Sequence, residues 1–288
     1  MASRTKRATI AAETIKIIES GKYTDSSGQV VTIAAAIREM ISGTFHYDPM
    51  SFDELFRQRN EILAKQTETT KTKYLVNNTT TFAAAKELLD KDASPVLCLN
   101  FASAKNPGGG FISGSQAQEE CLARASGLYG SINRITKYYE TNRHCGTSLY
   151  THHMIYSPAV PVFRNDDDDL IDNPYEVSII TSPAVNRGAV CDHEPECLKE
   201  VESTMLDRID RILAIAVVRG YRRLVLGAWG CGVFRNEPGD VARWFSKQLR
   251  SQVYQHAFDT VYFAVLDKTA SLSTITPFRQ FFCDEAFV

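Results

Sequence analysis

The chain has 288 residues, of which 44% are hydrophobic and 23% are charged. This composition excludes large-scale disorder and predicts a globular protein with enough length to bury a core. The 32 Lys and Arg residues against 34 Asp and Glu give a formal net charge of −2, which excludes a global basic field for long nucleic acids. A polyanion would therefore have to be bound locally, and direct binding to DNA is not expected.

Cysteine usage and apolar patterning indicate the compartment. The seven cysteines are odd in number and scattered, which favours a reducing compartment over a disulfide framework. No apolar run is long enough to span a membrane, and Glu13 and Lys16 interrupt the N-terminal stretch before a signal-peptide core could form. We expect an intracellular protein, cytoplasmic or nuclear, that is a monomer and has no membrane partner.

The first seventy residues predict a mostly helical region. Apolar residues recur at helical spacing and end at Gly21, and Ser51 followed by Glu54 is a capping-box signature. The stretch KYTDSSGQVVTI has β-forming flanks around a turn sequence, which is typical of a small hairpin. We predict helices over 8–20, 33–40 and 51–65, and a hairpin over 22–33.

From residue 72 the pattern changes to alternating strands and helices. Short apolar runs predict strands over 73–76, 96–101, 154–156, 177–181, 222–226 and 260–266. Amphipathic runs predict helices over 80–90, 117–128, 195–219 and 240–254. This alternation is typical of a sheet covered by helices. We therefore predict an N-terminal helical accessory region over 1–72 and an α/β domain over 73–288.

The most informative stretch is NPGGGFISGSQAQEECLARASGLYG, residues 106–130. Gly108, Gly109 and Gly110 can take positive φ and turn their N–H groups toward an anion. Glu119 and Glu120 fall in the first turn of the helix predicted to follow. The stretch would thus bring two carboxylates to a loop suited to phosphate or ribose. An ordinary tight connection with two surface acids is the alternative interpretation.

A second glycine-rich loop, GAWGCGVFRNEPGD at 227–240, follows the predicted strand over 222–226. A strand that feeds a glycine loop and then a helix places ligands at the carboxyl ends of parallel strands. The backbone of this loop could donate to phosphate oxygens, and a tight turn is the alternative. We expect the two glycine loops to face each other across a crevice.

The combination of GGG, seven residues and QEE resembles the signature of poly(ADP-ribose) glycohydrolases, and NFASAKNPGGGF and QEECLARASGLY resemble the bacterial-type branch. The resemblance implies a macrodomain-like three-layer α/β/α fold with a mixed central sheet and an N-terminal helical extension. It implies a hydrolase that cleaves the ribose–ribose O-glycosidic bonds of poly(ADP-ribose), mainly from chain ends, and releases ADP-ribose. Partners would be poly(ADP-ribose) or ADP-ribosylated proteins, and the context would be reversal of ADP-ribosylation in the DNA damage response.

Two other functions fit the same pocket. One is a reader that binds ADP-ribose without cleaving it, although such a protein would be expected to lack the acid that Glu120 supplies. The other is an enzyme that removes mono-ADP-ribose from protein side chains, which differs in the leaving group only.

The resemblance implies distinct roles for the two glutamates. Consecutive helical residues point about 100° apart, so Glu119 and Glu120 cannot perform the same task on one atom. In the family the second glutamate is catalytic and the first holds ribose hydroxyls, which assigns Glu120 as general acid and base. A general acid must carry a proton near neutral pH, yet a helix N-terminus favours ionised carboxylate. Repulsion from Glu119 and from substrate phosphates would oppose that preference.

The remaining predicted site residues bind substrate. Asn106 would bind ribose hydroxyls, or it would set the turn before Pro107. Phe234 would shape the terminal-ribose pocket, as the resemblance implies, or it would pack in the core. The predicted substrate-binding residues are Asn106, Gly108, Gly109, Gly110, Gln118, Gly227, Gly230, Cys231, Gly232, Val233 and Phe234.

Other chemistry-bearing residues are assigned structural roles. Cys121 could be a nucleophile, but no histidine is near in sequence to activate it, so packing is favoured. Histidines and cysteines between 144 and 197 match no pattern with two close ligand pairs, and neither a metal nor a cofactor is expected. The Asp166–Asp169 run is predicted to be a solvated loop, and a solvated helix end is predicted for Arg219, Arg222 and Arg223.

Overall fold

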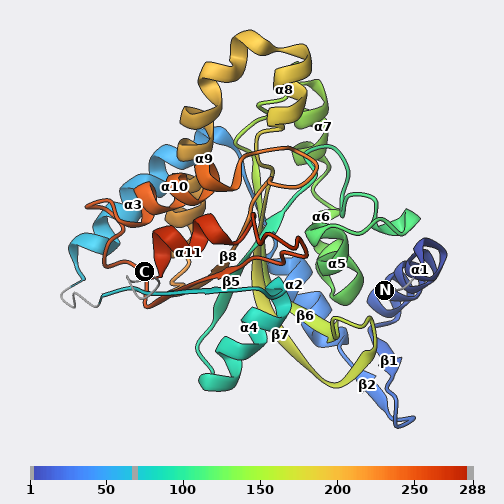
Figure 1. Cartoon of the computed structure of the whole chain (residues 1–288). Helices are drawn as coiled ribbons and strands as arrows, with labels where there is room; N and C mark the ends of the chain where they lie inside the picture. Colours follow the sequence, from blue (N-terminus) through green and yellow to red (C-terminus); the bar gives the residue numbers. More distant parts are fainter. Residues whose placement is uncertain (1–2, 67–70, 284–288) are drawn as a thin grey trace. The chain divides into compact units, whose positions relative to one another are not determined.

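The computed structural model describes residues 3–66 and 71–283 (Figure 1). The chain divides into two compact units, each assembled from several segments. The first comprises Met1–Tyr47, Asn100–Cys145 and His153–Pro183, and the second comprises Asp48–Leu99, Gly146–His152 and Ala184–Val288. The chain does not pass from one unit to the other at residue 72, and the domain boundary placed there stays a prediction.

The first unit begins with the predicted helix, hairpin and helix. These are α1 (Arg4–Ser20), β1 (Lys22–Thr24), β2 (Val30–Thr32) and α2 (Ala34–Gly43). Helix α1 begins four residues earlier than predicted because the Ser3 hydroxyl accepts from the N–H of Lys6 (3.2 Å) and caps it. Gly21 ends the helix in the left-handed conformation, with φ 68.

Three antiparallel strands complete the sheet of the first unit. They are β3 (Phe45–Tyr47), β6 (Met154–Arg164) and β7 (Leu170–Ser182), and β6 pairs with both neighbours. Strands β6 and β7 are much longer than predicted. Proline within a run argues against a strand, but Pro158 here falls in a register shift between Ser157 and Val160. The short β3 was not predicted.

The second unit contains four parallel strands in the order β5, β8, β9 and β4. Their bounds are Val96–Phe101, Arg223–Leu226, Thr260–Ala264 and Lys73–Asn77, and the last two residues of β5 belong to the first unit. Strand β8 is buried at every position and β5 at all but its last, as expected for strands covered on both faces. The antiparallel and parallel strands belong to a seven-stranded sheet, which is mixed as predicted.

The helices of the second unit are α3 (Phe52–Ala64), α4 (Thr81–Lys91), α8 (Arg187–His193), α9 (Val201–Val218), α10 (Pro238–Leu249) and α11 (Thr276–Phe282). Four of these helices, α3, α4, α9 and α10, overlap predicted helices, and α8 and α11 were not predicted. The capping box predicted at Ser51 is wrong, because Glu54 instead pairs with Arg57 (2.6 Å). Asp48 caps the preceding 3-10 turn η1 (Pro49–Ser51). The helix predicted over 195–219 begins as the 3-10 helix η3 (Pro195–Glu200).

Two arginines predicted to be solvated have fixed partners. The Arg223 side chain is buried and donates to the carbonyl of Leu88 (2.9 Å). Arg222 donates through two nitrogens to the Asp259 carboxylate, at 2.9 and 2.6 Å. These hydrogen bonds link segments far apart in sequence, and Nε of Arg223 has no partner among the described residues.

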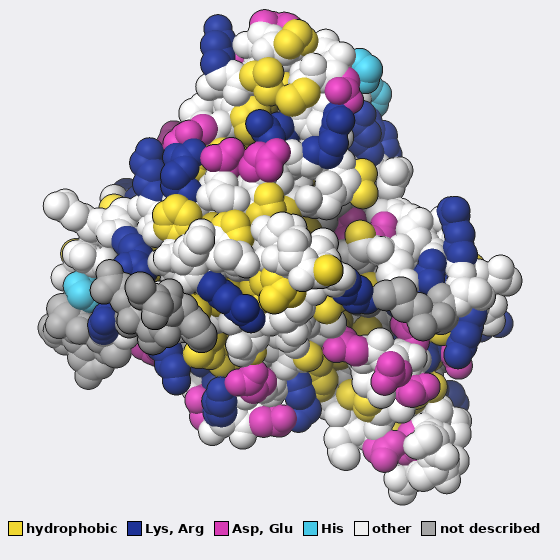
Figure 2. Space-filling view, in the orientation of Figure 1, with side chains coloured by type: hydrophobic (Ala, Val, Ile, Leu, Met, Phe, Trp, Pro, Cys, Tyr) yellow, Lys and Arg dark blue, Asp and Glu magenta, His cyan; other side chains and the backbone are white. Residues whose placement is uncertain are grey.

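The surface carries no single-sign field on the face that Figure 2 shows, where basic and acidic side chains are interspersed. This agrees with the nearly balanced composition. Across residues 3–66 and 71–283, no helix combines the length and apolar character needed to cross a membrane.

Candidate active site

The glycine loop follows β5 in the first unit, and two of its residues require glycine. Gly108 and Gly109 have φ of 67 and 59, which L-residues with a Cβ rarely adopt. A Cβ atom on Gly109 would lie 2.5 Å from Oε1 of Glu120. The loop therefore brings its backbone directly against the carboxylate that the sequence predicted to be catalytic.

The Glu120 carboxylate is held by two backbone donors. Its Oε1 accepts from the N–H of Gly110 (3.0 Å) and its Oε2 accepts from the N–H of Ala117 (2.7 Å). Ala117 precedes helix α5 (Gln118–Ala125) and has no side-chain oxygen, so Glu120 itself satisfies a donor at the helix start. The seven residues 111–117, which we call the spacer, are thus tied to Glu120 at both ends. The side chain is only 9% exposed.

Glu119 is buried more deeply, at 3% exposure. Its Oε2 accepts from the N–H of Ser103 (2.7 Å) and its Oε1 accepts from Nδ2 of Asn100 (3.2 Å). Burial raises the pKa of Glu119 to about 8, although these hydrogen bonds partly oppose the shift. Glu119 therefore holds a proton at neutral pH. Sequence reasoning did not single out Glu119 for a raised pKa.

Two polar residues near Glu119 were missed by sequence reasoning. Asn100 is fully buried, and its Oδ1 has no hydrogen-bond partner among the described residues. Tyr139, on α7 (Thr136–His144), is also buried, and its hydroxyl has no partner within the same residues. Burial first and the charge of Glu119 second raise the Tyr139 pKa. A polar side chain inside the apolar run VLCLNF was the available signal for Asn100.

Gln118 and Asn106 each accept a hydrogen bond from a backbone N–H group. The Oε1 of Gln118 accepts from the N–H of Phe101 (2.9 Å), which ties the start of α5 to the end of β5. Asn106 is exposed, and its carbonyl accepts from the N–H of Gly109 (3.0 Å), so it sets the turn. Substrate binding by either residue stays a prediction.

Helix α5 is shorter than the predicted span of 117–128. It ends at Ala125, and Ser126 forms an isolated bridge with Val162 before α6 (Leu128–Ile132) begins. The predicted packing role of Cys121 agrees with its half-buried position, where burial raises the thiol pKa. A raised pKa disfavours the thiolate that a nucleophile requires.

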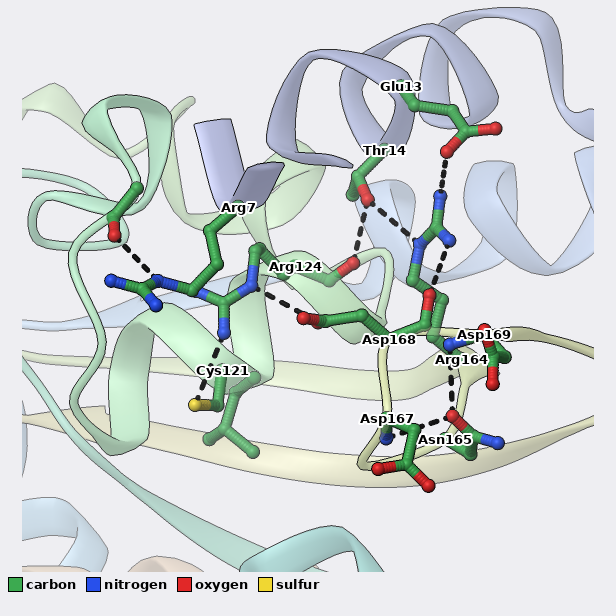
Figure 3. A network of polar contacts seen from close by, with 12 residues as sticks. Arg7, Glu13, Thr14, Cys121, Arg124, Arg164, Asn165, Asp167, Asp168 and Asp169 are labelled. Carbon is green, nitrogen blue, oxygen red and sulfur yellow. Dashed lines mark hydrogen bonds and ion pairs between the residues drawn. The ribbon is translucent and has the colours of Figure 1, made fainter. Parts of the chain in front are cut away.

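The Asp166–Asp169 run is not simply a solvated loop. It forms the turn between β6 and β7, and Asp168 makes an ion pair with the buried Arg124 (3.2 Å; Figure 3). Asp168 has φ 67, and its N–H donates to the carbonyl of Asn165. The position of its partner Arg124, and not the run of acidic residues, decides the role of Asp168.

The second glycine loop, 227–234, lies in the second unit. Gly230 has φ 76, and a Cβ there would lie 2.5 Å from the Ala184 side chain. At Gly232, by contrast, a Cβ would meet no described atom within 4 Å. Val233 is 84% exposed, whereas Trp229 is fully buried. This loop is anchored at its start and open at its tip.

The tip of the second loop offers backbone donors. The N–H groups of Gly232, Val233 and Phe234 donate no hydrogen bond to a described residue. Phe234 is half-buried, with its ring centroid 6.0 Å from that of Tyr150. Burial raises the thiol pKa of Cys231 to about 12, which keeps it neutral. Whether the two glycine loops face each other stays a prediction.

The comparisons with known proteins identify the family. A family model described as the catalytic domain of microbial-type PARG (poly(ADP-ribose) glycohydrolase) matches residues 11–165. A solved glycohydrolase from Thermomonospora curvata is 42% identical, with a TM-score of 0.91, and the match covers 96% of this chain and 100% of that one. A structure from the same organism bound to the inhibitor ADP-HPD has 42% identity and a TM-score of 0.87, with 96% and 99% covered.

A glycohydrolase from Deinococcus radiodurans in complex with ADP-ribose is 46% identical, with a TM-score of 0.79 and coverage of 87% of this chain and 98% of that chain. The comparison with curated proteins found no match. The mixed sheet and the carboxylate pair beside a glycine loop define a macrodomain-like glycoside hydrolase. The chain belongs to the microbial-type poly(ADP-ribose) glycohydrolase family. The predicted family, fold class and enzyme class are confirmed.

Proposed function

We propose that the chain hydrolyses the ribose–ribose O-glycosidic bonds of poly(ADP-ribose) and releases ADP-ribose, with Glu120 as general acid and then base. One observation carries the proposal: Glu119 and Glu120 are buried side by side behind the glycine loop, and backbone N–H groups hold both carboxylates. Support comes from the relative that was solved in complex with ADP-ribose.

The reaction moves one proton from Glu120 to the substrate and one proton from water back to Glu120. Glu120 gives its proton to the leaving ribose oxygen while the anomeric carbon gains oxocarbenium character. Water then attacks that carbon and returns a proton to Glu120. Glu119, whose pKa is raised by burial, hydrogen-bonds the hydroxyls of the reacting ribose. Adjacent residues on one helix cannot flank a bond from both sides, so this scheme uses one catalytic carboxyl where most glycosidases use two.

The second loop binds the diphosphate in this proposal. Its support is the set of N–H groups at Gly232, Val233 and Phe234, which resemble the donor arrays that bind phosphate oxygens. Asn106 and the Phe234 ring would contact the terminal ribose. We infer mainly exo-cleavage from chain ends.

We infer an intracellular protein, cytoplasmic or nuclear, whose partners are poly(ADP-ribose) or ADP-ribosylated proteins. Because the net charge is −2 and binding is local, its affinity for free ADP-ribose would depend only shallowly on salt.

Two isosteric variants test the roles of the glutamates. Glu120→Gln keeps the shape and removes the proton donor, so it should slow turnover of poly(ADP-ribose) by roughly 10²–10⁴-fold and leave ADP-ribose affinity within a few-fold. Glu119→Gln should change both turnover and binding, because its role is to hold the sugar. Single-turnover assays and calorimetric titration with ADP-ribose measure the two quantities.

Product analysis separates the proposal from its alternatives. Early release of monomeric ADP-ribose from poly(ADP-ribose) is expected. A protein that binds ADP-ribose and cleaves neither the polymer nor a mono-modified protein is a reader. Preferential release of ADP-ribose from the mono-modified protein indicates an enzyme that removes mono-ADP-ribose from protein side chains. Abundant oligomers early in the digestion would contradict exo-cleavage, and near-wild-type turnover by Glu120→Gln would overturn the assignment of the acid.

A further inference from the structure

The spacer is held by arginines along three consecutive carbonyls. Each carbonyl accepts a hydrogen bond from a different guanidinium, and two of these arginines come from α1. The carbonyl oxygens of Ser113, Gly114 and Ser115 accept from Arg4 Nε (3.0 Å), Arg7 Nε (2.8 Å) and Arg124 Nη1 (3.0 Å), respectively. Charge-assisted hydrogen bonds of this kind fix geometry more strongly than neutral ones.

The spacer backbone also packs tightly against the first turn of α1. Gly114 has φ 76, and a Cβ there would lie 2.1 Å from the carbonyl oxygen of Arg4 and 3.1 Å from the backbone nitrogen of Ala8. The N–H of Ser115 in the spacer donates to the carbonyl of Gly110, which directly precedes the spacer (3.1 Å). Helix α1 and the spacer therefore share one close backbone contact in addition to the arginine bonds.

Arg124 anchors this contact inside the first unit. Its side chain is 2% exposed, and besides Ser115 it faces Asp168 and donates to Sγ of Cys121 at 3.5 Å (Figure 3). The hydroxyl of Thr14 on α1 donates to the Arg124 carbonyl (2.7 Å). A guanidinium at this depth requires its partners, because an unpaired buried charge is strongly destabilising.

A second buried arginine closes the network around α1. Arg164 donates to the Asp168 carbonyl (2.8 Å), to Glu13 (2.6 Å) and, less closely, to the Thr14 hydroxyl (3.4 Å). Figure 3 shows these contacts joining α1, α5 and the β6–β7 turn. Helix α1 is thereby fixed to the elements that carry and surround the catalytic helix.

We propose that Arg4, Arg7 and Arg124 are positioning residues that act on catalysis through Glu120. The two N–H groups that hold the Glu120 carboxylate lie at Gly110 and Ala117, which flank the three anchored carbonyls. Holding these carbonyls sets where the two donors point, and so sets the orientation of the carboxyl group. The inference rests on the proposed role of Glu120, and it gives the N-terminal helix a part in the chemistry.

The test uses the two arginines of α1, because Arg4 is exposed and Arg7 is half-buried, whereas Arg124 is fully buried. An unpaired buried charge, which would destabilise the fold, is thereby avoided. The double variant Arg4→Ala/Arg7→Ala should lower kcat on poly(ADP-ribose) by about 2- to 10-fold for each hydrogen bond lost. Calorimetric affinity for ADP-ribose should stay within about twofold. The matched control is Lys6→Ala, because Lys6 is exposed on the same turn and its ammonium makes no hydrogen bond or ion pair with a described residue. Lys6→Ala should leave both quantities unchanged.

A double-mutant cycle distinguishes positioning from general support of the fold. If the arginines act through Glu120, the Arg4→Ala/Arg7→Ala pair should cause no further loss when added to Glu120→Gln in single-turnover assays. Arg124→Lys keeps a cation beside Asp168 but loses the planar guanidinium with its several donors. It should therefore also cause no further loss when it is added to Glu120→Gln. Thermal unfolding of each variant reports the folded fraction at the assay temperature.

The outcomes are distinct. An unchanged kcat in the double variant, or an equal loss with and without Glu120→Gln, would overturn the positioning role while leaving the proposed function intact. Near-wild-type turnover by Glu120→Gln alone would overturn the proposed function, and the positioning role with it. Loss of kcat that disappears in the Glu120→Gln background supports both.

Discussion

The two glycine loops of this protein use the same residue type for opposite purposes. In the first, the backbone N–H of Gly110 is bound to Glu120, and glycine at 109 makes room for that carboxylate. In the second, the N–H groups at the tip donate to no described residue, and the space beside Gly232 is open. One loop positions the protein's own carboxyl groups, and the other presents its donors outward.

The difference between the two loops matches the different demands of proton transfer and of ligand binding. A carboxyl group that transfers a proton must be held near its productive geometry, because a displacement of about 1 Å can cost about 100-fold in rate. A loop that binds a diphosphate needs donors that water occupies until the ligand arrives. The first loop is bonded to Glu120, whereas the second is held at Gly230, at Trp229 and through the Phe234 carbonyl, which accepts from the N–H of Gly188 (2.9 Å).

Among substitutions in the two loops, Gly109→Ala in the first loop should have the largest effect. The new Cβ would lie 2.5 Å from Oε1 of Glu120 in a backbone with φ 59, so either the loop or the carboxyl group must move. We expect kcat to fall by about 100-fold. Steady-state assays on poly(ADP-ribose) measure this, with unfolding curves to confirm that the variant is folded. A kcat within threefold of wild type would show that the loop does not fix the acid.

The raised pKa of Glu119 predicts how stability changes with pH. The folded state keeps the proton up to about pH 8, whereas the unfolded state releases it near the ordinary value of 4.5. Between these values the folded state binds more protons, so the free energy of unfolding should fall as pH rises, by at most about 1.4 kcal/mol per pH unit. Denaturant titrations at pH 5, 6.5 and 8 measure it. Glu119→Gln should lack this contribution, and parallel pH profiles for the two proteins would contradict it.

Gly232→Ala is the counterpart of Gly109→Ala on the second loop. Its Cβ meets no described atom within 4 Å, so the free energy of unfolding should change by less than about 0.5 kcal/mol. If the backbone approaches a diphosphate there, the methyl group should raise KM by about tenfold, equivalent to about 1.4 kcal/mol, and leave kcat unchanged. A fall in kcat with an unchanged KM would show that this loop, too, acts on the chemistry.

The smallest effect is expected for Val233→Thr. The side chain is 84% exposed, so stability should stay within about 0.5 kcal/mol of wild type. Affinity for ADP-ribose should fall by only a few-fold, through loss of an apolar contact at the loop tip. Calorimetric titration measures it, with Val30→Thr, at 63% exposure on the hairpin strand β2, as the matched control. Equal effects from both variants would count against a ligand contact at Val233.

Much of the fold was predictable because its signals are local. The glycine run, the adjacent glutamates and the apolar strand before them indicated the site, and the predicted helix and hairpin at the N-terminus are present. The errors occur where distant contacts override local preference. Helix α5 stops at Ser126 because that residue bridges Val162, and β6 continues through Pro158 because a register shift absorbs the proline.

The sequence by itself determined which residues could carry the chemistry: glycines that tolerate positive φ, two acids at a helix start, and helices and strands set by apolar periodicity. Only the tertiary structure decided that burial raises the pKa of Glu119, that Asp168 pairs with Arg124, and that α1 holds the spacer. The physical reason is that desolvation and ion pairing depend on which side chains surround a group. For Arg124 these surroundings include Asp168 and Thr14, which come from segments far away in the chain that local patterns do not encode.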